Sequence, residues 1–122
     1  MNLIRMDAPL NTLGIDIGSV SIAVAEINPK REIYKTAYQF HHGNIAETFT
    51  EIMNDFDLGR ICGMAATSST PSILKANQRY DNRVAIIEAA HHFNQKIGAI
   101  LVVGGEAFGL IEFDEKGRYR SF

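Results

Sequence analysis

The amino-acid sequence predicts an α/β protein with a mixed sheet of about five strands and helices on its faces. Segments rich in Ile, Val and Ala occur at 12–17 and 20–27, and a β-branched and aromatic segment follows at 33–40, as is typical of strands in a covered sheet. Two segments with helical spacing of apolar residues then precede further apolar runs at 60–66 and 97–103, which are expected to be the fourth and fifth strands of this sheet. Strands joined through helices run parallel, so the sheet is expected to contain both strand directions.

The first three strands are expected to form an antiparallel meander. Gly18 and Ser19 lie where the first two strands meet, and glycine is typical of tight turns between antiparallel strands. The polar stretch "NPKRE" at 28–32 carries Pro29 and predicts a second turn.

Two helices are predicted to cover the sheet. Asn44 is expected to cap the first, with Glu47 completing a capping box three residues later. The apolar residues of this helix fall on one face up to Gly59: Ile45, Phe49, Ile52, Met53 and Phe56. Asp81 is expected to open the second helix, whose apolar residues should point to the core: Val84, Ile87 and Phe93.

An internal repeat appears when residue 16 is aligned with residue 102. The offset matches four pairs between the segments: Gly18 with Gly104, Glu26 with Glu112, Ile27 with Phe113, and Lys30 with Lys116. Chance similarity between two glycine-turn hairpins is the alternative. The repeat predicts that the same hairpin is built twice, with a first lobe over 1–95 and the start of a second, truncated lobe over 96–122.

Composition restricts the class of protein. The 122 residues include 12 basic and 14 acidic side chains, without the basic stripe that nucleic-acid binding needs. The single cysteine, Cys62, excludes an intrachain disulfide framework and is predicted to be a small buried residue of an interior strand. The absence of a disulfide framework predicts a cytoplasmic protein. No apolar stretch reaches the length of a membrane span, so we expect no membrane segment.

A carboxylate and a glycine turn together suggest a phosphate site. Glycine lets an anion approach the main chain, so the N–H groups of Gly18, Ser19 and Val20 are candidate hydrogen-bond donors to a phosphate. Asp16 would then hold hydrated Mg²⁺, which prefers one or two carboxylates together with phosphate and water. Alternatively, Asp16 accepts hydrogen bonds from its own turn and binds no ligand.

Other polar residues have weaker signals. Thr67 and Ser68 follow a strand and could meet a phosphate, whereas capping of a short helix by Thr70, with Pro71 at its first position, is favoured for this loop. The pairs His41-His42 and His91-His92 are interpreted as a strand-end pair and a helix-surface pair, because neighbouring side chains diverge and do not chelate a metal by themselves.

Two motifs resemble a known family. "LGIDIGS" at 13–19 and "VVGGEAFGLIEFDEKGRYRSF" at 102–122 resemble the superfamily of acetate and sugar kinases, heat-shock chaperones and actin. More narrowly they resemble the activators of 2-hydroxyacyl-CoA dehydratases, which include the benzoyl-CoA reductase ATPase subunits. The resemblance implies a ribonuclease H-like, actin-like ATPase lobe. It also implies that the hairpin at 16–21, which includes Ser21, binds ATP phosphate with Mg²⁺.

The second hairpin departs from the family pattern. It is similar to the family's second phosphate hairpin at 102–107, which implies cofactor contacts by Gly104 and Gly105. However, Val102, Glu106 and Ala107 stand where the family has an acid, Gln and Asp. The iron-sulfur cluster of the full-length family needs cysteines that this chain does not contain.

The resemblance implies a function with two alternatives. The first reading is the ATP-binding lobe of an ATPase that activates a CoA-ester dehydratase or reductase by ATP-driven electron transfer. It implies a dehydratase partner and a homodimer, and the 122-residue chain is expected to be a fragment inactive alone. One alternative is a sugar or acid kinase lobe, although no acid occurs at 66–68 to serve as a base. The other alternative is a non-catalytic interaction domain.

Overall fold

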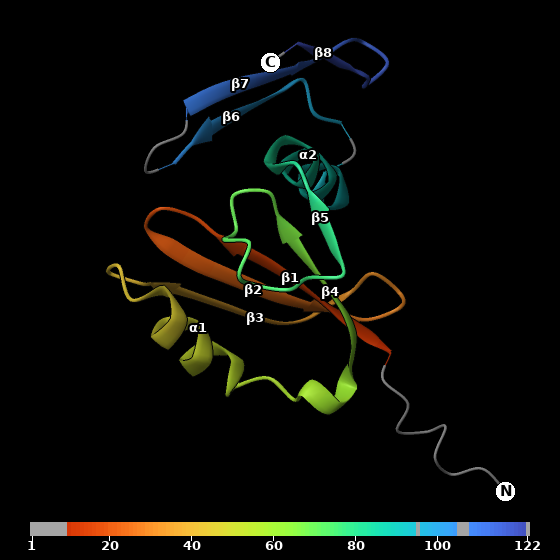
Figure 1. Ribbon diagram of the computed structural model, residues 1–122. Helices are drawn as coiled ribbons and strands as arrows, with labels where there is room; N and C mark the ends of the chain where they lie inside the picture. The colour runs from red at the N-terminus through yellow and green to blue at the C-terminus, as the bar shows by residue number, and fades with distance from the viewer. Residues whose placement is uncertain (1–9, 95, 105–107, 122) are drawn as a thin grey trace, which may run out of the picture. The chain divides into compact units, whose positions relative to one another are not determined.

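The computed structural model describes residues 10–94, 96–104 and 108–121. Its contacts divide the chain into two compact units, the first ending at Tyr80 and the second beginning at Asp81. Each unit has its own sheet (Figure 1). The boundary at residue 95 expected from the repeat stays a prediction.

The first unit contains the predicted mixed sheet of five strands. Their order is β3-β2-β1-β4-β5. The strands are β1 (Asn11–Ile17), β2 (Ser21–Ile27), β3 (Ile33–Phe40), β4 (Ile61–Thr67) and β5 (Gln78–Tyr80). β1, β2 and β3 form the expected antiparallel meander, whereas β4 runs parallel to β1 and β5 parallel to β4. The fold class predicted from the sequence is therefore confirmed.

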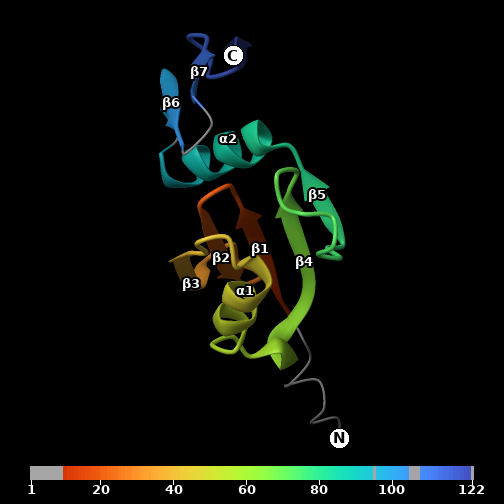
Figure 2. The same ribbon diagram turned by 60° about the vertical axis from the view of Figure 1, so that its left-hand side comes forward.

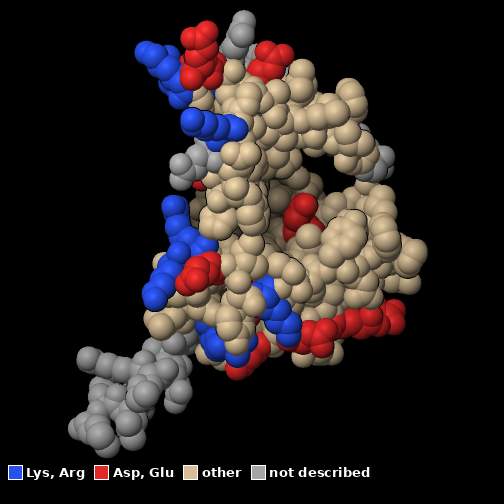
Figure 3. Space-filling model, turned by 180° about the vertical axis from the view of Figure 1, so that it is seen from behind, with Lys and Arg blue, Asp and Glu red and all other residues tan. Residues whose placement is uncertain are grey.

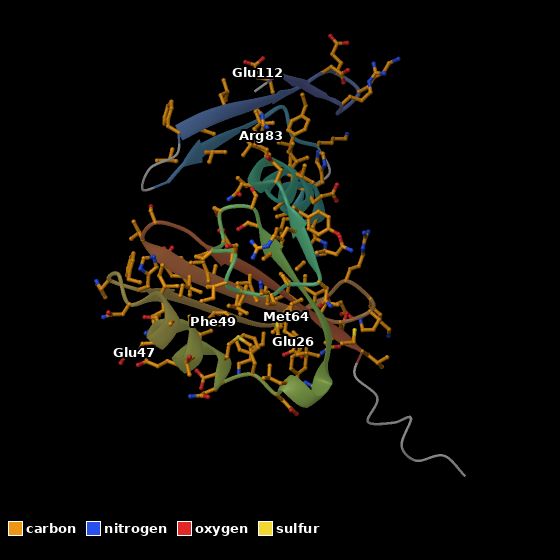
Figure 4. All side chains as sticks on the ribbon, in the orientation of Figure 1. Glu26, Glu47, Phe49, Met64, Arg83 and Glu112 are labelled. Carbon is orange, nitrogen blue, oxygen red and sulfur yellow. The ribbon has the colours of Figure 1, made fainter. Side chains whose placement is uncertain are left out.

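Helix α1 (Ile45–Met53) covers one face of this sheet and lies against β2 and β3 (Figures 1 and 2). Phe49 of this helix faces the sheet, where it packs against the core, and Glu47 points away from it (Figure 4). The buried core comprises Leu13, Ile15, Ile17, Ile22, Val24, Ile52, Phe56 and Ala66. Alternate residues of β1 and β2 thus meet one stripe of the helix, as strand and helix periods require.

The boundaries of this helix differ from those expected. Asn44 precedes α1, but its side chain makes no capping hydrogen bond, so the predicted capping box does not form. The helix ends at Met53 rather than near Gly59, and the 3₁₀ turn η2 (Leu58–Arg60) leads into β4. Phe56 is nevertheless buried, because the chain after the helix folds back onto the core.

The second unit contains helix α2 (Asn82–Phe93) and a sheet of three strands in the order β6-β7-β8. These strands are β6 (Ala99–Val103), β7 (Phe108–Phe113) and β8 (Tyr119–Ser121). The run at 97–103 was expected to be the fifth strand of the main sheet, and this was wrong, because β5 takes that place. β5 has only three residues, all exposed, and therefore no apolar pattern that could reveal it.

Helix α2 begins as predicted but presents a different face. The Asp81 side chain accepts a hydrogen bond from the Arg83 backbone N–H and caps the helix. Val84 and Phe93 are exposed rather than directed to a core. Ile87, the third predicted residue, is half-buried, and His91 contacts the sheet of this unit with its ring centroid 5.1 Å from that of Phe113.

The repeat predicted from the sequence is present in the backbone pairing. Adding the offset of 86 positions to β1–β2 pairs reproduces every pair of β6–β7, from Leu13↔Glu26, which becomes Ala99↔Glu112, to Ile17↔Ile22, which becomes Val103↔Phe108. The register irregularity after Glu26 recurs after Glu112. The two meanders therefore share one register.

The turn that follows also repeats. The Asn28 side chain accepts the N–H groups of residues 30 and 32, and the Asp114 side chain accepts those of residues 116 and 118. Arg31 and Gly117 occupy the same place with φ of 66° and 79°. Chance similarity of two hairpins does not account for matching strands, irregularity and turn.

The two sheets differ in what covers them. In the first, Ile15, Val24 and their neighbours on the same face are buried in the core beside α1. The equivalent residues of the second sheet are exposed: Leu101, Val103, Phe108 and Leu110. Ile111 and Phe113, on the opposite face, are buried. Matching backbones therefore bury opposite faces.

The helices of the described residues are too short or too polar to cross a membrane.

Candidate functional site

The candidate site lies at the edge of the first sheet where β1 and β4 both end. Asp16 is the penultimate residue of β1, and Thr67 is the last residue of β4. The two strands are parallel neighbours, so their carboxyl ends meet at one edge. The hydroxyl of Thr67 donates a hydrogen bond of 2.7 Å to Asp16 Oδ1. The hydroxyl of Ser69 lies 3.3 Å from the same oxygen.

Asp16 is a carboxylate within an apolar strand, and the neighbouring strand supplies its hydrogen-bond partners. The carboxylate of Asp16 accepts its hydrogen bonds from the end of β4 and the loop after it, not from the turn after β1 as the alternative reading expected. Asp16 is exposed, and its Oδ2 has no hydrogen-bond partner among the residues that the structure describes. One oxygen of the carboxylate is therefore oriented by hydroxyls, and the other is open to a cation or water.

Thr70 fastens this loop to the end of β1. Its side chain is buried, and its Oγ1 accepts a 3.0 Å hydrogen bond from the Ile17 backbone N–H. The same oxygen lies 3.0 Å from the Thr67 hydroxyl. Because Thr67 gives its proton to Asp16, Thr70 donates to Thr67, and the hydroxyls form a chain that ends at the carboxylate.

The predicted short helix after Thr70 is absent, and a turn closed by a hydrogen bond from Leu74 N–H to the Pro71 carbonyl takes its place. Arg79 of β5 holds this turn from the other side. Its guanidinium donates to the carbonyl oxygens of Thr70, Pro71 and Leu74 at 2.7, 3.0 and 2.6 Å. The sequence analysis missed Arg79, since nothing in the "NQRY" stretch indicates which carbonyls it meets.

The turn between β1 and β2 offers two open donors. Gly18 N–H donates to the Ser21 carbonyl at 3.0 Å, so it is engaged within the turn. The N–H groups of Ser19 and Val20 have no acceptor within the described part of the chain, and both residues are exposed. Ser21 pairs with Phe40 in the sheet. The N–H groups that remain available to donate hydrogen bonds to a phosphate are therefore those of Ser19 and Val20.

His41 directly follows β3, and both its side chain and its backbone form hydrogen bonds with this turn. Its ring is buried, Nε2 lies 2.9 Å from the Gly18 carbonyl oxygen, and Nδ1 accepts a 3.0 Å hydrogen bond from Gly43 N–H. Its own backbone N–H donates to the Val20 carbonyl at 3.0 Å. The sequence analysis read His41 as part of a strand-end pair and assigned it no contact with the turn.

The second hairpin matches the first in backbone but not in chemistry. Val102 occupies the position equivalent to Asp16, and Gly104 that equivalent to Gly18, directly after β6. Gly105, Glu106 and Ala107 lie outside the described residues. The cofactor contacts expected of Gly104 and Gly105 stay predictions.

Metal ligands at the candidate site are few. No group of three or more His, Cys, Asp or Glu side chains gathers anywhere in 10–94, 96–104 and 108–121. The single open carboxylate oxygen of Asp16 fits Mg²⁺, because this ion needs only one or two protein carboxylates when phosphate and water complete its shell.

Cys62 lies in β4, the strand in which the sequence placed it, but its predicted burial is wrong. It is exposed rather than buried. The β1–β4 ladder passes from Asn11↔Ile61 to Thr12↔Gly63, which leaves Cys62 as an extra, unpaired residue. A lone exposed thiol supplies no cluster site.

The charged residues form no continuous basic surface on the face seen in Figure 3. Lys and Arg side chains and Asp and Glu side chains occur there in small separate groups between wider uncharged areas.

Comparisons with known proteins identify the fold. No protein-family model matches the chain, and no curated protein matches it. The structure is similar to the activator of the 2-hydroxyisocaproyl-CoA dehydratase from Clostridium difficile with bound ADPNP, with a TM-score of 0.74 and 14% identity over 92% of this chain. It is also similar to component A of the (R)-2-hydroxyglutaryl-CoA dehydratase of Acidaminococcus fermentans, with a TM-score of 0.73 and 16% identity over 89% of this chain.

The chain spans less than half of these neighbours, 44% and 45% of their lengths. Its fold is that of the dehydratase activators, as the resemblance implied.

Proposed function

We propose that this chain is the nucleotide-binding lobe of an ATPase that activates a CoA-ester dehydratase or reductase. One observation carries the proposal. Among the described residues, the N–H groups of Ser19 and Val20 in the turn after β1 have no acceptor, and Oδ2 of Asp16, near the end of that strand, has no donor. This arrangement belongs to a fold shared with an activator whose structure contains ADPNP.

Each residue has a defined part in nucleotide binding. Ser19 and Val20 donate main-chain hydrogen bonds to phosphate oxygens, which favours anions without a charged side chain. Asp16 Oδ2 faces hydrated Mg²⁺, while Thr67 and Ser69 hold the carboxylate through Oδ1. Bound Mg²⁺ supplies positive charge that offsets the repulsion between Asp16 and the phosphates.

Electron transfer to a dehydratase is the wider function proposed. The chain contains one cysteine, so any iron-sulfur cluster depends on residues other than these 122. Within the proposal, the residues described here bind Mg·ATP and do not drive electron transfer alone. A homodimer in the cytoplasm and a boundary between lobes near residue 95 belong to the same proposal.

The test is a titration of Mg·ATP into ¹⁵N-labelled protein, followed by amide chemical shifts. Saturable shifts at Ser19 and Val20 that require Mg²⁺ are expected. Asp16→Asn keeps an oxygen for Thr67 and Ser69 but removes the charge, so it should weaken binding at least about tenfold. Glu47→Gln, an exposed carboxylate on α1 that points away from the sheet, is the matched control and should bind like the wild type.

Two results would reject the proposal. Absence of shifts at millimolar ATP would remove the phosphate site. Equal affinity of Asp16→Asn and the wild type would show that Asp16 does not bind the metal.

A non-catalytic interaction domain is the second candidate function, favoured by Val102 at the position equivalent to Asp16. Absence of Mg·ATP binding would support it.

A further inference from the structure

His41 is a buried polar side chain whose contacts the proposed function does not yet use. Only 4% of its surface is exposed, and both ring nitrogens have backbone partners. Histidine is seldom fully buried without such partners, since an unsatisfied ring nitrogen costs free energy. Its partners lie at the turn that carries Ser19 and Val20.

The partners determine which nitrogen carries the proton. Gly43 N–H is a donor and points at Nδ1, so Nδ1 must present its lone pair. The proton of the neutral ring therefore sits on Nε2 and is donated to the Gly18 carbonyl oxygen at 2.9 Å. The Gly43 N–H reaches Nδ1 because the backbone turns sharply after His41, with φ of 49° at His42 and 83° at Gly43.

This hydrogen bond orients the donor of the next residue. The Gly18 carbonyl and the Ser19 N–H belong to one trans peptide unit, in which the two groups point in opposite directions. With the carbonyl held toward the buried ring, the Ser19 N–H points away from it. The backbone N–H of His41 holds the Val20 carbonyl in the same way. The peptide that carries Val20 N–H thus lies between two held peptides.

We propose that His41 is a positioning residue that presents the Ser19 and Val20 N–H groups to phosphate by holding the Gly18 carbonyl through Nε2–H. The proposal rests on the proposed function, because it assigns the turn to nucleotide phosphates. His41 touches neither phosphate nor metal. It acts by removing the freedom of the turn before the ligand arrives, which lowers the entropic cost of binding.

Two substitutions separate the two ring contacts. The side-chain nitrogen of Gln is as many bonds from Cα as Nε2, so His41→Gln keeps the donor to Gly18. The side-chain oxygen of Asn corresponds to Nδ1, so His41→Asn keeps the acceptor for Gly43 but does not reach Gly18. His42→Asn is the control on the exposed neighbour, because Asn accepts the positive φ of that position.

The expected result is a difference between Gln and Asn. Loss of one neutral hydrogen bond predicts Mg·ATP binding about five- to tenfold weaker in His41→Asn, with His41→Gln and His42→Asn within about twofold of the wild type. Affinity is read from the amide shifts of Ser19 and Val20, and folding from the melting temperature. The ring ¹⁵N shifts of the wild type should show the Nε2–H tautomer.

Each of the other possible results would overturn either the role of His41 or the proposed function. If the wild type binds and His41→Asn binds equally well, the role of His41 is wrong and the proposed function stands. If both variants lose affinity in proportion to their loss of stability, His41 is merely structural. Absence of binding by the wild type overturns the proposed function together with this role. An Nδ1–H tautomer in the wild-type ring overturns the role even if His41→Asn fails to fold.

Discussion

Replacement of Gly18 by alanine tests whether this glycine is required by the fold of the turn or by a ligand bound to it. Gly18 does not have a positive φ, the backbone region that favours glycine. A Cβ built on this residue meets only the Ser21 carbonyl oxygen, at 4.0 Å, which is ordinary contact distance. The fold therefore has no steric reason to require glycine here.

The substitution should raise the free energy of unfolding slightly. Alanine restricts the unfolded chain more than glycine does, and at a compatible position this stabilises a protein by about 0.4–1 kcal/mol. The melting temperature should therefore rise by a few degrees or stay unchanged.

Nucleotide binding should change in the opposite direction. If phosphate approaches the main chain at Ser19 and Val20, a methyl group on the preceding residue obstructs that approach, and we expect affinity for Mg·ATP to fall at least about tenfold. Gly14→Ala is the matched control. Gly14 lies in β1, also without positive φ, and its added Cβ meets nothing within 4 Å.

The assay combines a thermal melt with the amide titration for wild type, Gly18→Ala and Gly14→Ala. Weaker binding with unchanged or higher stability, only in Gly18→Ala, would support a ligand at the turn. Affinity equal to the wild type would refute the reasoning, because the glycine would then serve neither fold nor ligand. A large loss of stability would contradict the structural premise.

Two further predictions concern stability. Glu26 is fully buried and accepts hydrogen bonds from Asn11 and Arg60 at 2.6 and 3.2 Å. Burial acts to raise its pKa, but these bonds outweigh burial and hold the pKa of Glu26 below its ordinary value. Because the pKa of Glu26 is lower in the folded than in the unfolded state, its ionisation stabilises the fold at pH values above the unfolded-state pKa, and this stabilisation should be lost as the pH falls through the folded-state pKa. Urea unfolding measured at several pH values should therefore show a smaller loss of stability in acid for Glu26→Gln than for the wild type. An equal loss in both proteins would contradict this prediction. Thr70→Val removes the acceptor of the buried Ile17 N–H and should lower the free energy of unfolding by about 1–3 kcal/mol. Thr70→Ser keeps the hydroxyl and should cost less, so equal losses in urea unfolding would show that the hydroxyl is not the cause.

Local patterns predicted most of the first unit. The meander strands were visible there, as were the start of α2 at Asp81 and the repeat offset in the second unit, because apolar period and turn residues are properties of neighbouring residues. β5 was missed, since a three-residue exposed strand next to β4 has no period of its own. Cys62 was assigned to the correct strand but wrongly expected to be buried, because an irregularity between two strands shifts the alternation without any local sign.

By itself, the sequence determined that an acid and a glycine turn follow one another between two strands, and that this hairpin occurs twice. It could not determine which groups surround the acid. Thr67 and Ser69 reach Asp16 from 51 and 53 residues away, and the ring of His41 reaches Gly18 from 23 residues away. Only tertiary structure decided these contacts, because they depend on which strands become neighbours and in which register, and no period along the chain encodes either.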